Sequence, residues 1–159
     1  ARIEQKLKTL GCGLPPELKS KARIQENQGP RQFSSQDGLT ILVGRSNCEN
    51  DKLSLQIARG NDLFFHVRGC PGSHVVVRKA REKSVPLETL LDAATLAIHY
   101  SKMRGNGRAE VSYTPCKYVS KPKGAKPGLV RISNERTLRP GGDPDRLKRL
   151  LASLQQKED

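Results

Sequence analysis

The sequence predicts an α+β domain, with a mostly antiparallel sheet built from hairpins, two or three covering helices and an N-terminal helical arm. Two stretches rich in β-branched and aromatic residues flank the turn dipeptides Asp37-Gly38 and Pro71-Gly72, which predicts hairpins. An apolar face with helical spacing follows Pro86 and ends before Gly105, which predicts a long helix. At 159 residues, the chain has the length of about one ordinary domain.

The first predicted hairpin runs from Phe33 to Val43. The second, central hairpin is the stretch DLFFHVRGCPGSHVVVR, residues 62–78, where Pro71-Gly72 suits a type II turn with a positive φ at Gly72. An odd pairing sum across this turn places His66 and His74 on opposite faces, and a one-residue change in loop length places them together. The sequence leaves this register open.

Residues 47–58 fit either a strand or a helix, and the capping box formed by Ser46 and Glu49 favours the helix. Asp143-Pro144 is expected to cap a final helix. We expect short strands at Ala109 to Thr114, Lys117 to Val119, Leu129 to Ile132 and Glu135 to Leu138. The final helix is expected to place Leu147, Leu150, Leu151 and Leu154 on one face.

We assign residues 1–31 to the end of a coiled-coil helix and a linker, and residues 32–159 to the domain itself. Ile3, Leu7 and Leu10 keep helical spacing, but three positions equally fit a solvated spacer. The chain begins within a helix-like phrase, which suggests a piece of a longer protein. Its apolar runs are all shorter than the roughly 18 residues of a membrane span, so we expect a soluble chain with no membrane partner.

Four cysteines are spread along the chain without a C-x-x-C pair. We therefore expect reduced thiols in an intracellular compartment rather than a disulfide framework. A zinc site using His66 and Cys70 is the weaker alternative. We predict no metal ion and no cofactor.

Positive charge is concentrated in one region. The net charge is +13, and residues 93–134 contain eight basic residues and one acidic residue, which favours a polyanionic partner. The segment SKPKGAKPG, residues 120–128, presents lysines on a backbone stiffened by proline and suits contact with phosphates. The alternative is a solvated basic loop. The candidate RNA-binding residues are Lys117, Lys121, Lys123, Lys126, Arg131, Arg45, Arg78 and Lys102.

The central hairpin and the preceding segment contain more polar side chains than a core hairpin needs. This candidate polar cluster comprises Asn47, Asn50, Asp51, Asp62, His66, Arg68, Ser73 and His74. It could bind a phosphate or ribose, or it could be a purely structural network. Common enzyme motifs such as G-x-x-x-x-G-K-[ST] and H-E-x-x-H are absent from the sequence. A metal-nuclease site from Asp51, Asp62 and Glu110 is the weaker interpretation.

Several of these motifs together resemble a known family. The motifs that carry the resemblance are the central hairpin, the preceding GRSNCENDKLSLQIA, the AA and YSK of the long helix, VSYT and KYVSKPKGAKPG. In these motifs the chain resembles an NFACT-R domain, in particular the bacterial RqcH-type branch of the NFACT proteins of ribosome-associated quality control. The likeness extends from about Asp37 to Leu138. The family pattern falls on Asn47, Asn50, Asp51, Asp62, His66, Pro71, Gly72, Ser73, His74, Lys121, Pro122, Gly124, Lys126, Pro127 and Gly128. Phe64 and Leu63 stand where the family frequently has Trp, so base stacking there would be weaker.

The resemblance implies a non-catalytic RNA-binding domain that contacts tRNA and rRNA on an obstructed large ribosomal subunit. In family members this activity supports untemplated C-terminal alanine tailing, and the remaining NFACT domains of a longer chain would be further partners. The implied compartment is the cytoplasm, or an organelle of bacterial origin such as the plastid. Two alternatives stay open: an RNA-processing enzyme using His66, His74 and Asp62, and a protein-docking domain.

Overall fold

The computed structural model describes residues 29–79 and 84–154. Its strands are β1 (Arg31–Ser34), β2 (Thr40–Val43), β3 (Leu63–Val67), β4 (Val75–Val77), β5 (Val111–Pro115), β6 (Val119–Ser120), β7 (Arg131–Ile132) and β8 (Arg136–Leu138). Its helices are α3 (Asn47–Lys52), α4 (Leu87–His99) and α5 (Pro144–Ala152). A π-helical turn, Leu53–Ile57, continues α3, and a 3₁₀ turn, Cys116–Tyr118, links β5 to β6. Most of the predicted N-terminal arm lies outside the described residues.

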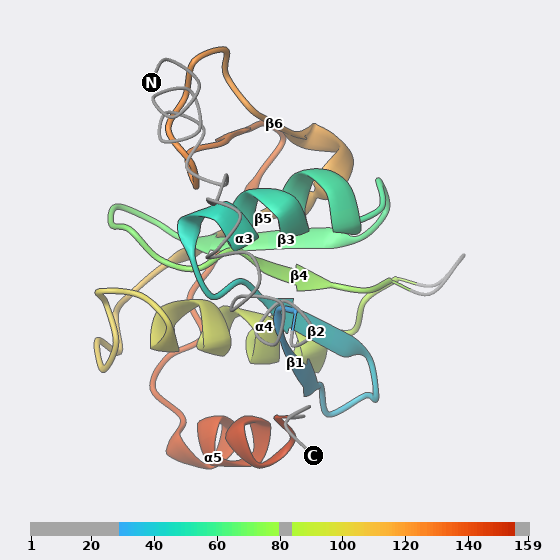
Figure 1. Cartoon of the computed structure of the whole chain (residues 1–159). Helices are drawn as coiled ribbons and strands as arrows, with labels where there is room; N and C mark the ends of the chain where they lie inside the picture. Colours follow the sequence, from blue (N-terminus) through green and yellow to red (C-terminus); the bar gives the residue numbers. More distant parts are fainter. Residues whose placement is uncertain (1–28, 80–83, 155–159) are drawn as a thin grey trace, which may run out of the picture.

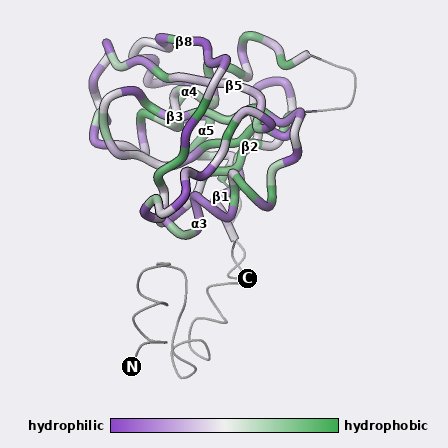
Figure 2. The backbone as a smooth tube through the Cα atoms, turned by 90° about the horizontal axis from the view of Figure 1, so that it is seen from above, coloured by the Kyte–Doolittle hydropathy of each residue, from purple (hydrophilic) through white to green (hydrophobic). Residues whose placement is uncertain are grey.

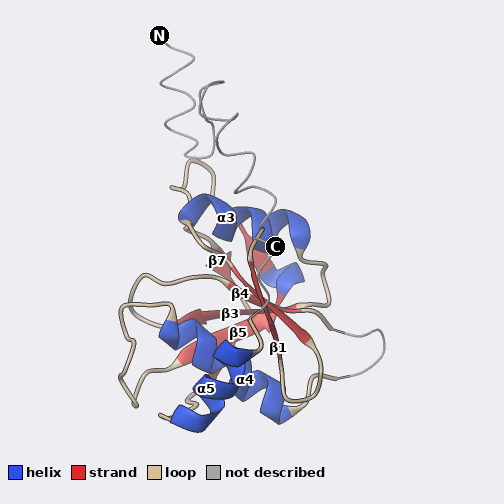
Figure 3. Ribbon diagram, turned by 60° about the horizontal axis from the view of Figure 1, so that its bottom comes forward, coloured by secondary structure: helices blue, strands red, loops and turns tan. Residues whose placement is uncertain are grey.

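A six-stranded antiparallel sheet in the order β1-β2-β4-β3-β5-β8 forms the centre of the domain. A second sheet consists of β6 and β7. α4 lies on one face of the large sheet, with α5 packed outside it, and α3 lies on the other face (Figures 1 and 3). The predicted α+β fold is confirmed.

Both faces of the large sheet are buried. On one face, Phe33, Ile41 and Phe65 pack with Ala94 of α4 and Leu150 of α5. On the other face, a smaller cluster comprises Leu42, Phe64, Val76, Leu53 and Cys116. Figure 2 shows the inner strand β2 as hydrophobic and the outer strand β8 as largely hydrophilic. Helical layers therefore shield a sheet whose middle strands are apolar on both sides.

Both predicted hairpins are present, but the turn of the central one differs from the expectation. Gly38 closes the first hairpin with φ +84°, as its turn dipeptide predicts. In the central hairpin, Gly69 and not Gly72 has the positive φ. Gly72 instead forms a bridge to Ser101, and a Cβ on Gly72 would lie 2.7 Å from Ser101 Cβ. Gly72 is thus required for close packing, and the type II turn prediction is wrong.

The register of the central hairpin answers the question that the sequence left open. Phe64 pairs with Val76 and Phe65 pairs with Val75, so the pairing sum is even. The side chains of His66 and His74 therefore share one face, with ring centroids 5.6 Å apart.

Local details confirm some expectations and correct others. Ser46 caps α3 by accepting a hydrogen bond from the Glu49 amide at 3.1 Å, as the capping box predicts. The strand predicted at Lys117 to Val119 is mostly the 3₁₀ turn, which the Val119 amide closes by donating to Cys116 O. Cys70 and Cys116 are free, whereas Cys48 is disulfide-bonded, so the expectation of reduced thiols is wrong at Cys48.

A buried ionic network fixes α5 to α4. Asp92, on α4, is fully buried, and its Oδ1 accepts from Arg146 at 2.6 Å and from Arg149 at 2.7 Å. Its Oδ2 accepts from the Gln36 amide at 2.8 Å, which also ties the first hairpin to this layer. Within the described ranges, none of the helices is long and apolar enough to cross a membrane.

Candidate nucleic-acid interface

Residues 120–128, here called the basic loop, are fastened to α3 by one carboxylate. Asp51 Oδ2 accepts from Lys121 Nζ at 2.8 Å, and Asp51 Oδ1 accepts from the Gly128 amide at 2.9 Å. Lys121 Nζ also donates to Lys126 O within the loop. Asp51 therefore holds both ends of the basic loop, and the loop lies on the same side of the large sheet as α3 (Figure 1).

His74 fastens the same loop to the central hairpin. Its Nε2 lies 3.0 Å from Gly128 O, its Nδ1 lies 2.7 Å from Ser54 Oγ, and its amide donates to Asn50 Oδ1 at 3.1 Å. Nδ1 also lies 3.1 Å from the Asn50 carbonyl oxygen. A carbonyl oxygen can only accept, so a neutral His74 ring donates to either Gly128 O or Asn50 O, and the Ser54 hydroxyl can serve Nδ1 as donor or acceptor. We call Asp51, His74, Lys121 and Gly128 the loop clamp.

The loop clamp contains a neutral histidine. Burial, with a smaller contribution from the neighbouring His66, lowers the pKa of His74 to about 4, against opposing effects of hydrogen bonds and Asp51. Burial also lowers the pKa of His66. Both ring nitrogens of His74 are engaged inside the protein, so His74 holds the loop and is not presented to a ligand.

The exposed cations of the basic loop are Lys123 and Lys126, and Arg131 is exposed in β7, where it pairs with Ser120. Lys121 differs from them, because its ammonium belongs to the loop clamp and its side chain is only 28% exposed. Of the predicted phosphate contacts in this region, Lys121 is therefore paired inside the protein, whereas Lys123, Lys126 and Arg131 are exposed.

Asp62 belongs to a separate network at the other end of β3. Its carboxylate accepts from the Arg59 amide at 3.0 Å, from the Lys79 amide at 3.0 Å and from Arg78 Nη1 at 3.2 Å. Asp62 lies four residues before His66, about 13 Å along an extended strand. The predicted grouping of Asp62 with the two histidines is not formed. The Asp62 carboxylate instead accepts hydrogen bonds from the turn before β3 and from the residues that follow β4.

The remaining predicted residues lie outside the loop clamp. Arg68 is exposed and pairs with Glu110 at 3.5 Å. Lys117 is exposed, with its Nζ 5.4 Å from the centre of the Tyr118 ring. Lys102 and Arg45 are exposed, and the Ser73 amide donates to Tyr100 O at 3.1 Å. Asn47 lies against Gly128, where an added Cβ would meet Asn47 Oδ1 at 2.9 Å.

Sequence reasoning missed two residues of the clamp's support. Ser54 is buried beneath His74, and its only sequence signal is a single hydroxyl between Leu53 and Leu55. Gly44 leaves room for Asn50, because a Cβ there would lie 2.0 Å from Asn50 Oδ1. Phe64 is 1% exposed, so it belongs to the core and offers no face to a base.

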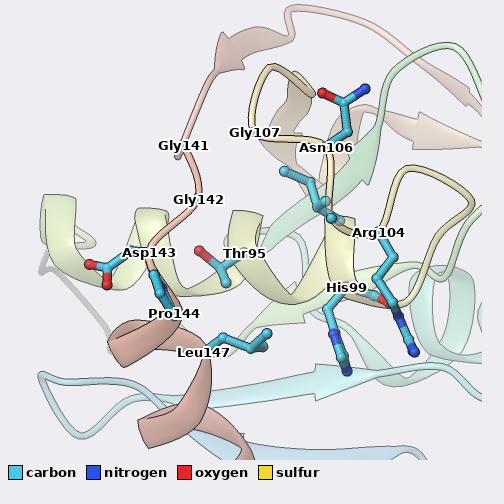
Figure 4. A pocket seen from close by; sticks show the side chains of 12 residues that line it. Thr95, His99, Arg104, Asn106, Gly107, Gly141, Gly142, Asp143, Pro144 and Leu147 are labelled. Atoms are coloured by element: carbon cyan, nitrogen blue, oxygen red, sulfur yellow. The ribbon is translucent and has the colours of Figure 1, made fainter.

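Two cavities of similar size lie away from the loop clamp. One, of about 410 Å³, lies between α4 and α5 and is lined in part by His99, Arg104, Asp143 and Leu147 (Figure 4). The other, of about 400 Å³, lies at the end of β5. No group of three or more His, Cys, Asp or Glu side chains in residues 29–79 and 84–154 is arranged to hold a metal ion.

These features define a class: an α+β domain that presents a cationic loop on a buried polar support. Comparisons with known proteins identify the family. The sequence profile described as the NFACT protein RNA binding domain matches residues 30–134. The chain belongs to this family, the RNA-binding domain of the NFACT/RqcH ribosome quality control proteins, and the resemblance noted from its motifs is confirmed.

Several relatives illustrate the extent of the likeness. The Rqc2 homolog RqcH of Bacillus subtilis (strain 168) is 34% identical over 145 residues, which cover 90% of this chain and 25% of that protein. The Streptococcus suis (strain 05ZYH33) protein of the same name is 38% identical over 127 residues, which cover 79% of this chain and 23% of that protein. This chain thus spans about a quarter of the length of these curated relatives.

One solved structure shows the same fold. It is the C-terminal part of the fibronectin/fibrinogen-binding protein from Streptococcus suis, with a TM-score of 0.71 and 37% sequence identity. The match covers 77% of this chain and 49% of that one.

Proposed function

We propose that this domain binds tRNA and rRNA on an obstructed large ribosomal subunit, with the basic loop as its main contact to the phosphate backbone. Lys123, Lys126 and Arg131 supply the outward charge. The observation that carries this proposal is the loop clamp, because a loop fixed by Asp51 and His74 presents its cations without first having to be ordered.

Charge distribution supports a backbone contact in preference to base reading by this loop. Lysine ammonium groups neutralise phosphates as point charges, and each contact releases counterions whatever the base. Arg45, Lys102, Arg78 and Lys117 lie on other parts of the domain and would add weaker, longer-range attraction. The whole surface then steers RNA toward the clamped loop.

Within a longer chain that carries the other NFACT domains, we propose that this contact supports untemplated C-terminal alanine tailing. The compartment would be that of the ribosome it serves, in the cytoplasm or an organelle of bacterial origin. The domain itself supplies position and affinity, and the reacting groups would lie elsewhere.

The geometry gives less support to the two alternatives. An RNA-processing site would need His66, His74 and Asp62 to act together on the substrate. His74 is buried with both ring nitrogens engaged and Asp62 lies at the other end of β3, which leaves the half-buried His66 without these partners. For a protein-docking role, the large apolar side chains that are exposed in the described residues lie on different elements: Leu55, Leu87, Leu129 and Leu151.

Salt dependence of tRNA binding tests the proposal. The variant Lys123→Ala/Lys126→Ala should bind more weakly, and the slope of log affinity against log salt should fall by about 1.5, as expected for two lost phosphate contacts. The control Arg108→Ala/Lys148→Ala removes the same charge from exposed positions near α4 and on α5. An equal change in slope for both pairs would leave only general electrostatic attraction and refute a loop-specific contact.

A further inference from the structure

We propose that the cavity at the end of β5 holds one unpaired nucleotide of the bound RNA, with its base against tyrosine rings and its phosphate near cations. This inference rests on the proposed RNA binding and adds a second, base-contacting site to it. The cavity, here called the tyrosine cavity, is lined by Leu63, Lys79, Ser84, Val85, Leu90, Tyr113, Thr114, Pro115, Tyr118, Asn134 and Arg136.

The tyrosine cavity offers aromatic surface in a fixed orientation. Tyr113 stacks on Phe65 across β3 and β5, with ring centroids 5.3 Å apart and an angle of 14° between the ring planes. Tyr118 follows in the 3₁₀ turn, beside the ammonium of Lys117. Both rings are partly exposed, unlike the buried Phe64. Aromatic rings of this kind bind bases by stacking.

The described lining residues of the cavity contribute positive charge. Lys79 and Arg136 line the cavity, and none of its described lining residues is acidic. The Lys79 amide donates to Asp62 Oδ1, which fixes the backbone at this residue. A ligand that combines a flat apolar ring with negative charge matches this lining, and a nucleotide is such a ligand.

Asn134 adds a polar group suited to a base edge. Its backbone has φ +54°, and its carbonyl accepts from Thr114 Oγ1 at 3.4 Å, which ties this turn to β5. An amide side chain offers both a donor and an acceptor, as base edges do. The volume of about 400 Å³ is at the lower end of ligand sites and suits one nucleotide.

A short segment connects this cavity to the basic loop. Arg131 pairs with Ser120 beside the loop, and Arg136 pairs with Tyr113 beside the cavity. Arg136 is five positions after Arg131, so their Cα atoms lie at most about 17 Å apart. One RNA strand could therefore contact the basic loop and place a neighbouring base in the tyrosine cavity.

The cavity between α4 and α5 does not offer this combination. It contains the Asp143 carboxylate, which accepts hydrogen bonds from the first amides of α5, and it has apolar walls such as Ile98 and Leu147. It therefore serves as a control site of matching size, and Asn106 in its wall is a counterpart to Asn134.

NMR titration of the full chain with adenosine and uridine monophosphates tests the proposal. We expect saturable shifts of the Tyr113, Asn134 and Arg136 amides, and roughly tenfold weaker binding of ribose 5-phosphate, which lacks the base. Tyr118→Leu should abolish the nucleotide shifts. Asn134→Gly tolerates the positive φ and should weaken them, whereas Asn106→Gly should leave them unchanged. Absent shifts at these amides, or equal binding of ribose 5-phosphate, would overturn the proposal.

Binding to tRNA separates this inference from the proposed function. Tyr118→Leu should lower the affinity roughly tenfold without changing the salt slope, whereas the loop variant lowers the slope. If the loop variant binds tRNA like the original chain, the proposed contact of the basic loop is refuted. The nucleotide titration would still test the tyrosine cavity independently. An unchanged tRNA affinity in Tyr118→Leu would refute a role of the cavity in RNA binding.

Discussion

Asp51 and Lys121 are separated by 70 positions in the sequence and meet in an ion pair of 2.8 Å between Oδ2 and Nζ. The same carboxylate accepts from the Gly128 amide. Lys121, one of the predicted phosphate contacts, is thus paired inside the protein, whereas Lys123 and Lys126 are exposed. Asp51 therefore fixes the position of the loop whose exposed lysines are the proposed contacts to RNA.

This ion pair should be measurable by a double-mutant cycle. Because the two side chains are 15% and 28% exposed, we expect Asp51→Ala and Lys121→Ala to couple by about 1 kcal/mol in the free energy of unfolding. The exposed pair Arg68 and Glu110, at 3.5 Å, should couple by less than about 0.5 kcal/mol. Urea unfolding of the single and double variants of each pair gives the two coupling energies. Equal coupling energies would contradict the role of the Asp51–Lys121 pair in the loop clamp.

The free energy of unfolding should depend on pH through His74. Its pKa is about 4 in the folded protein and about 6.5 when unfolded, so between these values the unfolded chain binds more protons. The contribution of His74 to the free energy of unfolding is therefore fully present above pH 6.5. It is lost as the pH falls toward 4, and the loss is on the order of 3 kcal/mol. His74→Gln should flatten this dependence, as measured by urea unfolding from pH 4 to 7. An unchanged pH profile in the variant would contradict the assignment.

Gly44 should not tolerate a methyl group. In Gly44→Ala the new Cβ would overlap the buried Asn50 side chain, whose Oδ1 accepts from the His74 amide. We expect a loss of about 3 kcal/mol from overpacking and from the broken hydrogen bond. Gly60→Ala, where the nearest atom is Lys117 Cβ at 3.5 Å, should change stability by less than about 0.5 kcal/mol. Thermal unfolding of the two variants gives the comparison.

Removal of the buried Asp92 carboxylate should loosen α5. Asp92→Ala leaves Arg146 and Arg149 without their shared partner and the Gln36 amide without its acceptor, so we expect a loss of about 3 kcal/mol or more. Faster amide hydrogen exchange along α5 would report the local effect. Glu135→Ala, at an exposed position, is the control. A variant with normal exchange in α5 would show that apolar packing of Leu150 suffices.

Local chemistry made much of the fold predictable. Asp37-Gly38 marks the first hairpin, Ser46 caps α3 and Asp143 caps α5, and each of these signals acts within a few residues. The two histidines were also identified from sequence, but the face that they share depends on the number of residues in the connection between β3 and β4.

Long-range partners could not be predicted. Gly128 meets His74 across 54 positions, and nothing near either residue specifies the other. Asp92 stands near the N-terminus of α4, where an acidic residue needs no tertiary partner, but the docking of α5 buries it completely. The dipeptide Pro71-Gly72 predicts a turn glycine, whereas the fold requires Gly72 for packing on Ser101.

Photo-crosslinking from single positions tests the central claim most directly. A photoreactive amino acid at position 123, in the basic loop, should crosslink bound tRNA or rRNA of an isolated large ribosomal subunit, whereas the same group at position 148 of α5 should not. Sequencing of the captured RNA should then return defined positions. Equal capture from both positions, or capture from position 148 alone, would contradict the account of the clamped loop as the RNA-binding face.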